Sequence, residues 1–240
     1  MPVIIVAMLN IAGSFVPLIT PFTDDGSTVS EVRLARVLRF YLNRGVEGFA
    51  LVTESGEFQT LSLAERKAFV EMVARETHNA IGLVVNATTE STSFSLDLAQ
   101  HASRHGARAA VICPPISGHL DQREHVDHIR MIASHAGLAV IVVDDRSVLQ
   151  EGAVGEIAKL PNVHLAWHSP SSPKLASDWF RCHSLIVEPM SGIPDSTVGD
   201  FVLRNRAAVS KCLLMDFDLE CGSPRMPVQP VPYREIRRAA

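Results

Sequence analysis

The chain has 240 residues, of which 47% are hydrophobic and 20% are charged. This apolar share provides for a sizeable core and excludes a globally disordered chain. The formal net charge of −4 lacks the basic face that nucleic acid or an anionic membrane surface requires, so neither partner is expected. No stretch of the sequence reaches the roughly 18 uninterrupted apolar residues of a membrane span.

The cysteines do not form a disulfide framework. No C-x-x-C pair occurs, and the gaps between the cysteines are long and uneven, which favours reduced thiols and a cytoplasmic location. The apolar residues 1–12 have no basic n-region, and we interpret them as a leading strand, extra packing or a start-site artefact rather than a signal peptide. The four cysteines are Cys113, Cys182, Cys212 and Cys221.

Short, nearly continuous apolar runs recur along the chain, each followed by a polar turn and an amphipathic stretch. From one run to the next, the starts lie 22 to 33 residues apart. This spacing fits parallel strands joined by helical crossovers, and continuous apolar runs are typical of strands buried on both faces. The predicted strands cover residues 15–20, 48–52, 81–85, 109–113, 139–143, 163–167 and 185–188.

Capping signals place two of the intervening helices. Ser62 with Glu65, and Asp121 with Glu124, have the spacing of a capping box. Glycines follow several predicted helices at the position where a left-handed backbone costs glycine little. The two capped helices are predicted over residues 64–76 and 125–135, and the glycines are Gly45, Gly106 and Gly137.

Six or seven strand–helix units predict either a closed barrel or a doubly wound sheet. No G-x-G-x-x-G follows the first strand, so a dinucleotide site is not supported.

Near the C-terminus we expect a helix over 198–208 and an eighth strand over 212–217. Prolines crowd the sequence beyond Gly222, so we divide the chain into a domain over 1–221 and a tail or arm over 222–240.

Several segments resemble the dihydrodipicolinate synthase / N-acetylneuraminate lyase family in order and spacing, from residue 13 to residue 169. This resemblance implies a (β/α)₈ barrel, here with a shortened or irregular C-terminal region. The segments are residues 13–26 (GSFVPLITPFTDDG), 45–48 (GVEG), 55–57 (SGE), 61–66 (LSLAER) and 161–163 (PNV).

The resemblance also implies a chemistry and an assembly. The family consists of lyases of the class I aldolase type, which act on small 2-oxo acids and need no separate cofactor. A lysine on the sixth strand forms an imine with the keto carbon, a tyrosine on the fifth strand relays protons, and a Gly-Thr-Thr-Gly-Glu turn holds the substrate carboxylate. By resemblance we expect a homo-oligomer, a dimer or a tetramer.

The sequence departs from the family at the chemical positions. Trp167 stands where the lysine is expected, and no lysine lies between Lys159 and Lys174. Val143 stands at the position of the tyrosine. An imine needs a free amine beside the keto carbon, so we expect no imine chemistry on the sixth strand and name no catalytic residue.

Polar residues at the carboxyl ends of the predicted strands form the expected ligand site, because barrels bind ligands there. Their expected ligand is a small molecule of the 2-oxo acid class. The candidate substrate-binding residues are Glu54, Ser55, Glu57, Asp144, Arg146 and Trp167.

Two groups could substitute for the missing lysine, and for each a simpler interpretation is preferred. Lys174 is interpreted as an exposed lysine. A metal held by Glu54, Glu57, Asp144 and His168 has no supporting spacing, so no metal is expected. His125 and His128 lie at helical spacing and are interpreted as surface residues.

Two functions stay open at this point. The first is a divergent lyase of the family that uses other residues. The second is a pseudoenzyme, a non-catalytic barrel that binds a small ligand or a paralogous subunit.

Overall fold

The computed structural model describes residues 15–144, 146–167 and 206–231. These residues form two compact units. The terminal unit holds residues 15–81 and 206–231, and the central unit holds residues 82–144 and 146–167. The strands predicted over residues 1–12 and 185–188, and most of the helix predicted over 198–208, lie outside the described residues.

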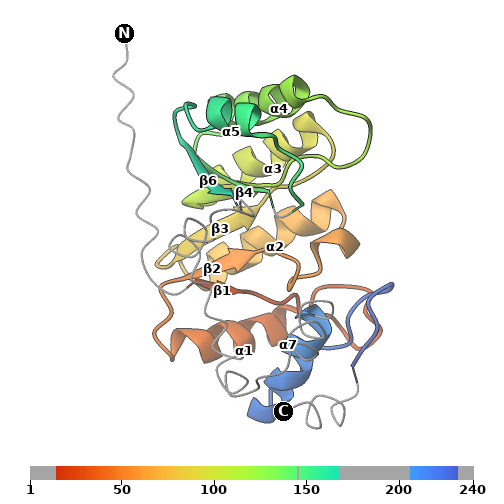
Figure 1. Ribbon diagram of the computed structural model, residues 1–240. Coiled ribbons are helices and arrows are strands. Elements are labelled where there is room, and N and C mark those ends of the chain that lie inside the picture. The colour runs from red at the N-terminus through yellow and green to blue at the C-terminus, as the bar shows by residue number, and fades with distance from the viewer. Residues whose placement is uncertain (1–14, 145, 168–205, 232–240) are drawn as a thin grey trace, which may run out of the picture. The chain divides into compact units, whose positions relative to one another are not determined.

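The terminal unit combines a parallel strand pair with helices from both ends of the chain. Phe15 of the first strand lies opposite Gly48 of the second, in parallel register. Both strands are almost completely buried. The elements are β1 (Phe15–Pro17), α1 (Glu31–Leu42), β2 (Gly48–Leu51), the 3₁₀ turn η1 (Phe58–Thr60), α2 (Leu63–Glu76), α7 (Arg206–Leu214) and the 3₁₀ turn η3 (Met215–Phe217) (Figure 1).

The predicted capping box at α2 is confirmed. The Ser62 side chain accepts from the Glu65 backbone N–H, and the Glu65 carboxylate accepts from the Ser62 N–H. These bonds satisfy two of the amides that a helix start leaves without partners. Gly45 adopts a φ of 71° after α1, as the sequence predicts for a residue beyond a helix end.

The eighth strand predicted over residues 212–217 is wrong, because these residues end α7 and form η3. The run Lys-Cys-Leu-Leu-Met-Asp-Phe contains no β-branched residue, and leucine and methionine favour helix. Val209 and Cys212, one helical turn apart, pack against Leu213 and Val231. Helical spacing therefore buries the apolar patch that the sequence interpretation assigned to a strand.

The segment after η3 returns to the start of the chain. The Phe22 N–H donates to the Cys221 carbonyl at 3.0 Å. A Cβ at Gly222 would lie 2.4 Å from the Phe22 carbonyl oxygen, and Gly222 has a φ of 71°. Only glycine allows the two backbones to approach this closely. The division of the chain at residue 221 stays a prediction.

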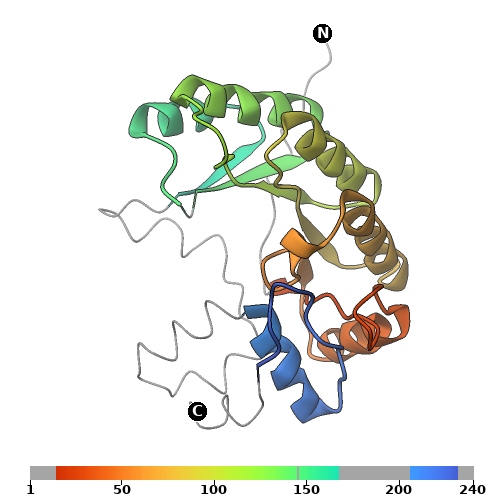
Figure 2. The same ribbon diagram turned by 90° about the vertical axis from the view of Figure 1, so that its right-hand side faces the viewer.

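The central unit is a parallel sheet whose strands follow one another in chain order. Neighbouring strands from β3 to β6 pair in parallel, and Asp144 lies opposite Trp167 at the end of the last pair. The helices α3, α4 and α5 lie on one side of these strands (Figure 2). The elements are β3 (Gly82–Asn86), α3 (Thr92–Arg104), β4 (Ala109–Ile112), α4 (Gln122–His135), β5 (Ala139–Asp144), α5 (Glu151–Ile157) and β6 (Val163–Trp167).

The six strands predicted between residues 15 and 167 are confirmed as β1 to β6, although β1 is three residues shorter than the predicted run. Consecutive residues Val140, Ile141 and Val142 are all buried. Both faces of β5 are therefore covered, which explains a continuous apolar run in place of an alternating one. Among the described residues, no helix is long and apolar enough to span a bilayer.

Candidate functional site

The turn over residues 53–57 follows β2 at its carboxyl end, where a barrel binds ligands. The Thr53 carbonyl accepts from the N–H groups of Gly56 and Phe58. The Thr20 hydroxyl, beyond β1, donates to the Gly56 carbonyl at 2.6 Å. A Cβ at Gly56 would lie 2.9 Å from the Leu18 carbonyl oxygen. The glycine in this turn is therefore needed for close packing against the segment after β1.

Two non-glycine residues with left-handed backbones enclose the turn. Val52 has a φ of 58° and Glu57 a φ of 57°. A β-branched residue is rarely found in this region, because its Cβ substituents crowd the backbone. Such strain persists only where the surroundings hold it, and it concentrates at functional sites.

The three predicted residues of this turn have different surroundings. Glu54 is exposed and Ser55 is half-buried. Glu57 is buried, and its Oε2 accepts from the Arg225 N–H at 2.7 Å. Glu54 and Ser55 are therefore accessible to a ligand, whereas Glu57 lies inside the unit.

A buried lysine compensates the charge of Glu57. Lys211 Nζ lies 2.6 Å from Glu57 Oε1, and the side chains are 4% and 0% exposed. Burial lowers the pKa of the Lys211 amine, and the neighbouring carboxylate acts in the opposite direction. The sequence interpretation missed Lys211 and Arg225. One signal was present, because Lys211 is the only charged residue of Ala207–Leu214, a run that is otherwise apolar except for Ser210.

Asp144 closes the loop after β5 in the central unit. Its Oδ1 accepts from the Val148 N–H and its Oδ2 from the Leu149 N–H, each at 2.8 Å. Its side chain is buried. Both carboxylate oxygens therefore hold the chain's own backbone, and the expectation that Asp144 contacts substrate gains no direct support. Arg146, two residues on, is exposed.

Trp167 ends β6 beside Asp144 in the strand register. The backbone thus brings together the ends of β5 and β6, as predicted. The structure does not describe the Trp167 side chain, and His168 and Lys174 lie outside the described residues.

The interpretation of His125 and His128 as surface residues is wrong. Both side chains are buried on α4, at 3% and 5% exposure. His128 Nδ1 lies 2.9 Å from the Thr92 hydroxyl, whereas His128 Nε2 and His125 Nδ1 have no hydrogen-bond partner among the described residues. Burial, reinforced by His125, lowers the pKa of His128 to about 4. Helical spacing could not show that α3 covers this side of α4.

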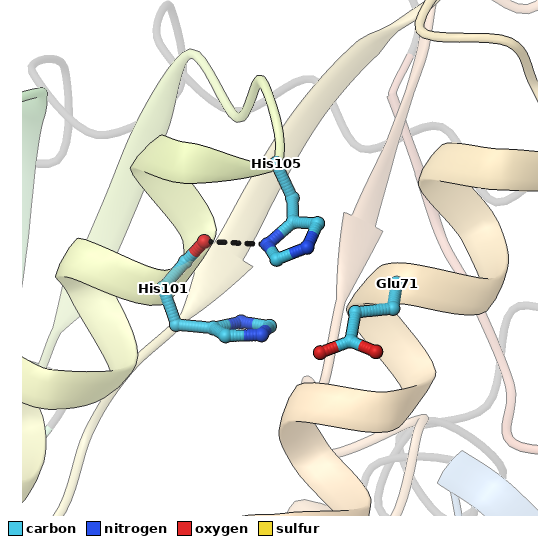
Figure 3. Close-up of side chains that lie close together, drawn as sticks. All are labelled: Glu71, His101 and His105. Atoms are coloured by element: carbon cyan, nitrogen blue, oxygen red, sulfur yellow. Dashed lines mark hydrogen bonds between the residues drawn. The ribbon is translucent and has the colours of Figure 1, made fainter.

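A second histidine pair lies at the end of α3. His105 Nδ1–H donates to the His101 carbonyl at 2.9 Å, and the ring centroids are 4.3 Å apart (Figure 3). This contact satisfies a carbonyl of the last helical turn, so it closes a helix end.

The fold class is that of the (β/α)₈ barrel. A solved dihydrodipicolinate synthetase-like protein from Pseudomonas aeruginosa superposes with a TM-score of 0.74 at 19% identity, over 95% of this chain and 98% of the other. The protein CdNal from Clostridium difficile, solved in complex with mannosamine, gives a TM-score of 0.78 at 15% identity, over 96% of this chain and 97% of the other.

Sequence similarity then identifies the family. The pattern of the dihydrodipicolinate synthetase family matches residues 10–164, and the chain belongs to this family. The 4-hydroxy-tetrahydrodipicolinate synthase of Bartonella quintana is 32% identical over 139 residues, which cover 57% of this chain and 47% of the relative. The N-acetylneuraminate lyase of Salmonella paratyphi B is 36% identical over 131 residues, covering 54% and 44%. The matched region thus spans about half the length of these relatives.

Proposed function

We propose that this protein is a divergent lyase of the aldolase type that binds small 2-oxo acids, without a lysine imine on its sixth strand. The observation that carries the proposal is the family match over residues 10–164, which ends within β6, a strand whose sequence Val-His-Leu-Ala-Trp contains no lysine. Tryptophan has no nucleophilic nitrogen and the strand contains no lysine, so it offers no amine that could form an imine with a keto carbon.

One further observation supports a 2-oxo acid as the ligand. A prophage protein of the same family from Escherichia coli K12 was solved in complex with pyruvate; it is 22% identical and has a TM-score of 0.53, over 56% of this chain and 45% of the other. Pyruvate is therefore the first ligand to test.

Borohydride trapping tests the absence of an imine. The protein is incubated with pyruvate and borohydride, and its intact mass is measured. We expect no pyruvyl addition, while a family member that carries the strand-six lysine gains the adduct under the same conditions. An added pyruvyl mass in this protein would contradict the proposal, and peptide mapping would then decide between Lys174 and another amine.

A non-catalytic barrel is the second candidate, and a specific observation favours it. The carboxylates of Glu57 and Asp144 both bind groups of the chain itself, so neither is free to act as an acid or base in this conformation. In this case the protein binds a small ligand or a paralogous subunit. Pyruvate binding without turnover of pyruvate adducts distinguishes it from the lyase.

We further propose a cytoplasmic homo-oligomer, a dimer or a tetramer. The proposal rests on family membership and on the exposed apolar side chains of the terminal unit, which include Val32, Met215 and Phe217. Sedimentation at micromolar concentration tests it. A single species of 26.2 kDa would contradict the assembly.

A further inference from the structure

The Glu57 carboxylate is held from two directions by the C-terminal segment of the terminal unit. Lys211 of α7 lies against Oε1 at 2.6 Å, and the backbone N–H of Arg225 donates to Oε2 at 2.7 Å. An ionised carboxylate without exposed surface is tolerable only when it is paired and hydrogen-bonded. The conformation of Glu57 thus depends on residues more than 150 positions away in the sequence.

Lys211 is itself fixed in place. Its Nζ lies 3.3 Å from the Ser223 carbonyl oxygen and 4.2 Å from the centroid of the Phe22 ring. Its neighbours on α7, Ala208 and Cys212, are buried. The amine is therefore held by the Glu57 carboxylate, a backbone carbonyl and an aromatic ring together.

Arg225 extends the same attachment to the loops around the turn. Its side chain donates to the carbonyls of Gly26 at 2.7 Å and Ser27 at 2.6 Å, which belong to the loop after β1. It also donates to the Thr60 carbonyl at 3.3 Å and pairs with Glu65 at 2.7 Å. One arginine therefore ties together the loops that follow β1 and β2.

The turn that these contacts hold is strained. Val52 and Glu57 keep left-handed backbones, with φ values of 58° and 57°, and such residues persist only where their surroundings hold them. The buried side of the turn is Glu57, and the accessible side carries Glu54 and Ser55. The contacts that hold Glu57 in place therefore also hold Glu54 and Ser55, the residues of the turn that a ligand can reach.

We infer that Lys211 and Arg225 are positioning residues that act through Glu57 to hold the strained turn over residues 53–57 in its ligand-binding conformation. This inference rests on the proposed function, because the proposed function supplies the ligand that the turn would bind. α7 and the following segment thus prepare the site without contacting the ligand.

The test uses the full chain and two readouts. Lys211→Met removes the amine, and Lys211→Met with Glu57→Gln removes both charges and leaves no unpaired buried ion. Lys159→Met, at an exposed lysine of the central unit, is the matched control. Amide hydrogen exchange is measured peptide by peptide, and pyruvate binding is measured by calorimetry.

We expect exchange over residues 53–58 to accelerate by about tenfold or more beyond any acceleration in α1 and α2, in both Lys211 variants. Pyruvate affinity falls by about tenfold or more in the same variants and is unchanged in the Lys159 control. A purely structural role would instead accelerate exchange by the same factor throughout the terminal unit.

The possible failures are distinguishable. If the parent does not bind pyruvate, the proposed function fails, and the exchange measurement alone decides about the positioning. If exchange over 53–58 stays at the parental rate in a folded variant, or if the parent and both variants bind pyruvate equally, the positioning is refuted. Failure of both variants to fold also refutes it, because the pair would then stabilise the whole unit.

Discussion

The Asp144 carboxylate and the Leu149 backbone are joined by a 2.8 Å hydrogen bond across the loop that follows β5. The second oxygen of Asp144 accepts from Val148 at the same distance, so one buried side chain holds two successive amides. A carboxylate predicted to contact substrate therefore holds the loop at the end of its strand.

Replacing this carboxylate tests that role. Asp144→Ala leaves both amides without their acceptor, and each unsatisfied buried group costs about 1–3 kcal/mol. We expect the free energy of unfolding to fall by about 2 kcal/mol or more in urea denaturation. Asp144→Asn keeps one acceptor oxygen and should lose less. Equal stability of the parent and the alanine variant would contradict the assignment.

The Lys211–Glu57 pair should behave as a buried ion pair in stability measurements. Lys211→Met alone leaves a buried carboxylate without its cationic partner, which costs about 3–5 kcal/mol. Adding Glu57→Gln removes the unpaired charge and should recover a large part of that loss. The two variants and the Glu57→Gln single mutant form a double-mutant cycle in urea. Additive losses would show that the two groups are not coupled.

Gly222 tests the close approach of the C-terminal segment to Phe22. Gly222→Ala places a Cβ 2.4 Å from a backbone oxygen at a φ of 71°, so we expect a loss of about 1 kcal/mol or more. The control is Gly152→Ala, since Gly152 lies in α5 and a Cβ there meets no atom within 4 Å. That control should be neutral or slightly stabilising. A neutral Gly222 variant would indicate that the segment lies elsewhere in solution.

The buried His128 predicts a loss of stability in weak acid. Its pKa in the folded protein is about 4, below the ordinary 6.5, so the unfolded chain binds the extra proton first. The stability is complete above about pH 6.5 and declines as the pH falls toward 4, with a slope of at most about 1.4 kcal/mol per pH unit. Denaturation midpoints at several pH values measure this slope. His128→Gln should flatten it, whereas His119→Gln, at an exposed histidine, should not.

Restoring the two chemical residues tests the proposed loss of imine chemistry. Trp167→Lys with Val143→Tyr returns an amine and a proton relay to the strand ends. Members of a covalent catalytic set act together, so neither single change is expected to suffice for turnover. We expect borohydride to trap pyruvate at the introduced lysine in the double variant and not in the parent. No adduct in the double variant would show that the surrounding pocket is also changed.

Local patterns in the sequence determined the alternating units of this protein. The positions of β1 to β6 followed from apolar runs. The starts of α2 and α4 followed from two capping pairs, Ser62 with Glu65 and Asp121 with Glu124. Each of these signals involves residues only a few positions apart, so it can be read from the sequence. The family resemblance was readable for the same reason, as it lies in short segments whose order is kept.

Only the tertiary structure decided what the charged and polar side chains do. Glu57 became a buried partner of Lys211, Asp144 an acceptor for its own loop, and His125 and His128 members of the core. Helical spacing predicts which residues share a face, but it does not tell whether another helix covers that face. The residues that pair with Glu57 come from the other end of the chain, so their approach depends on how the whole terminal unit packs, which no local pattern records.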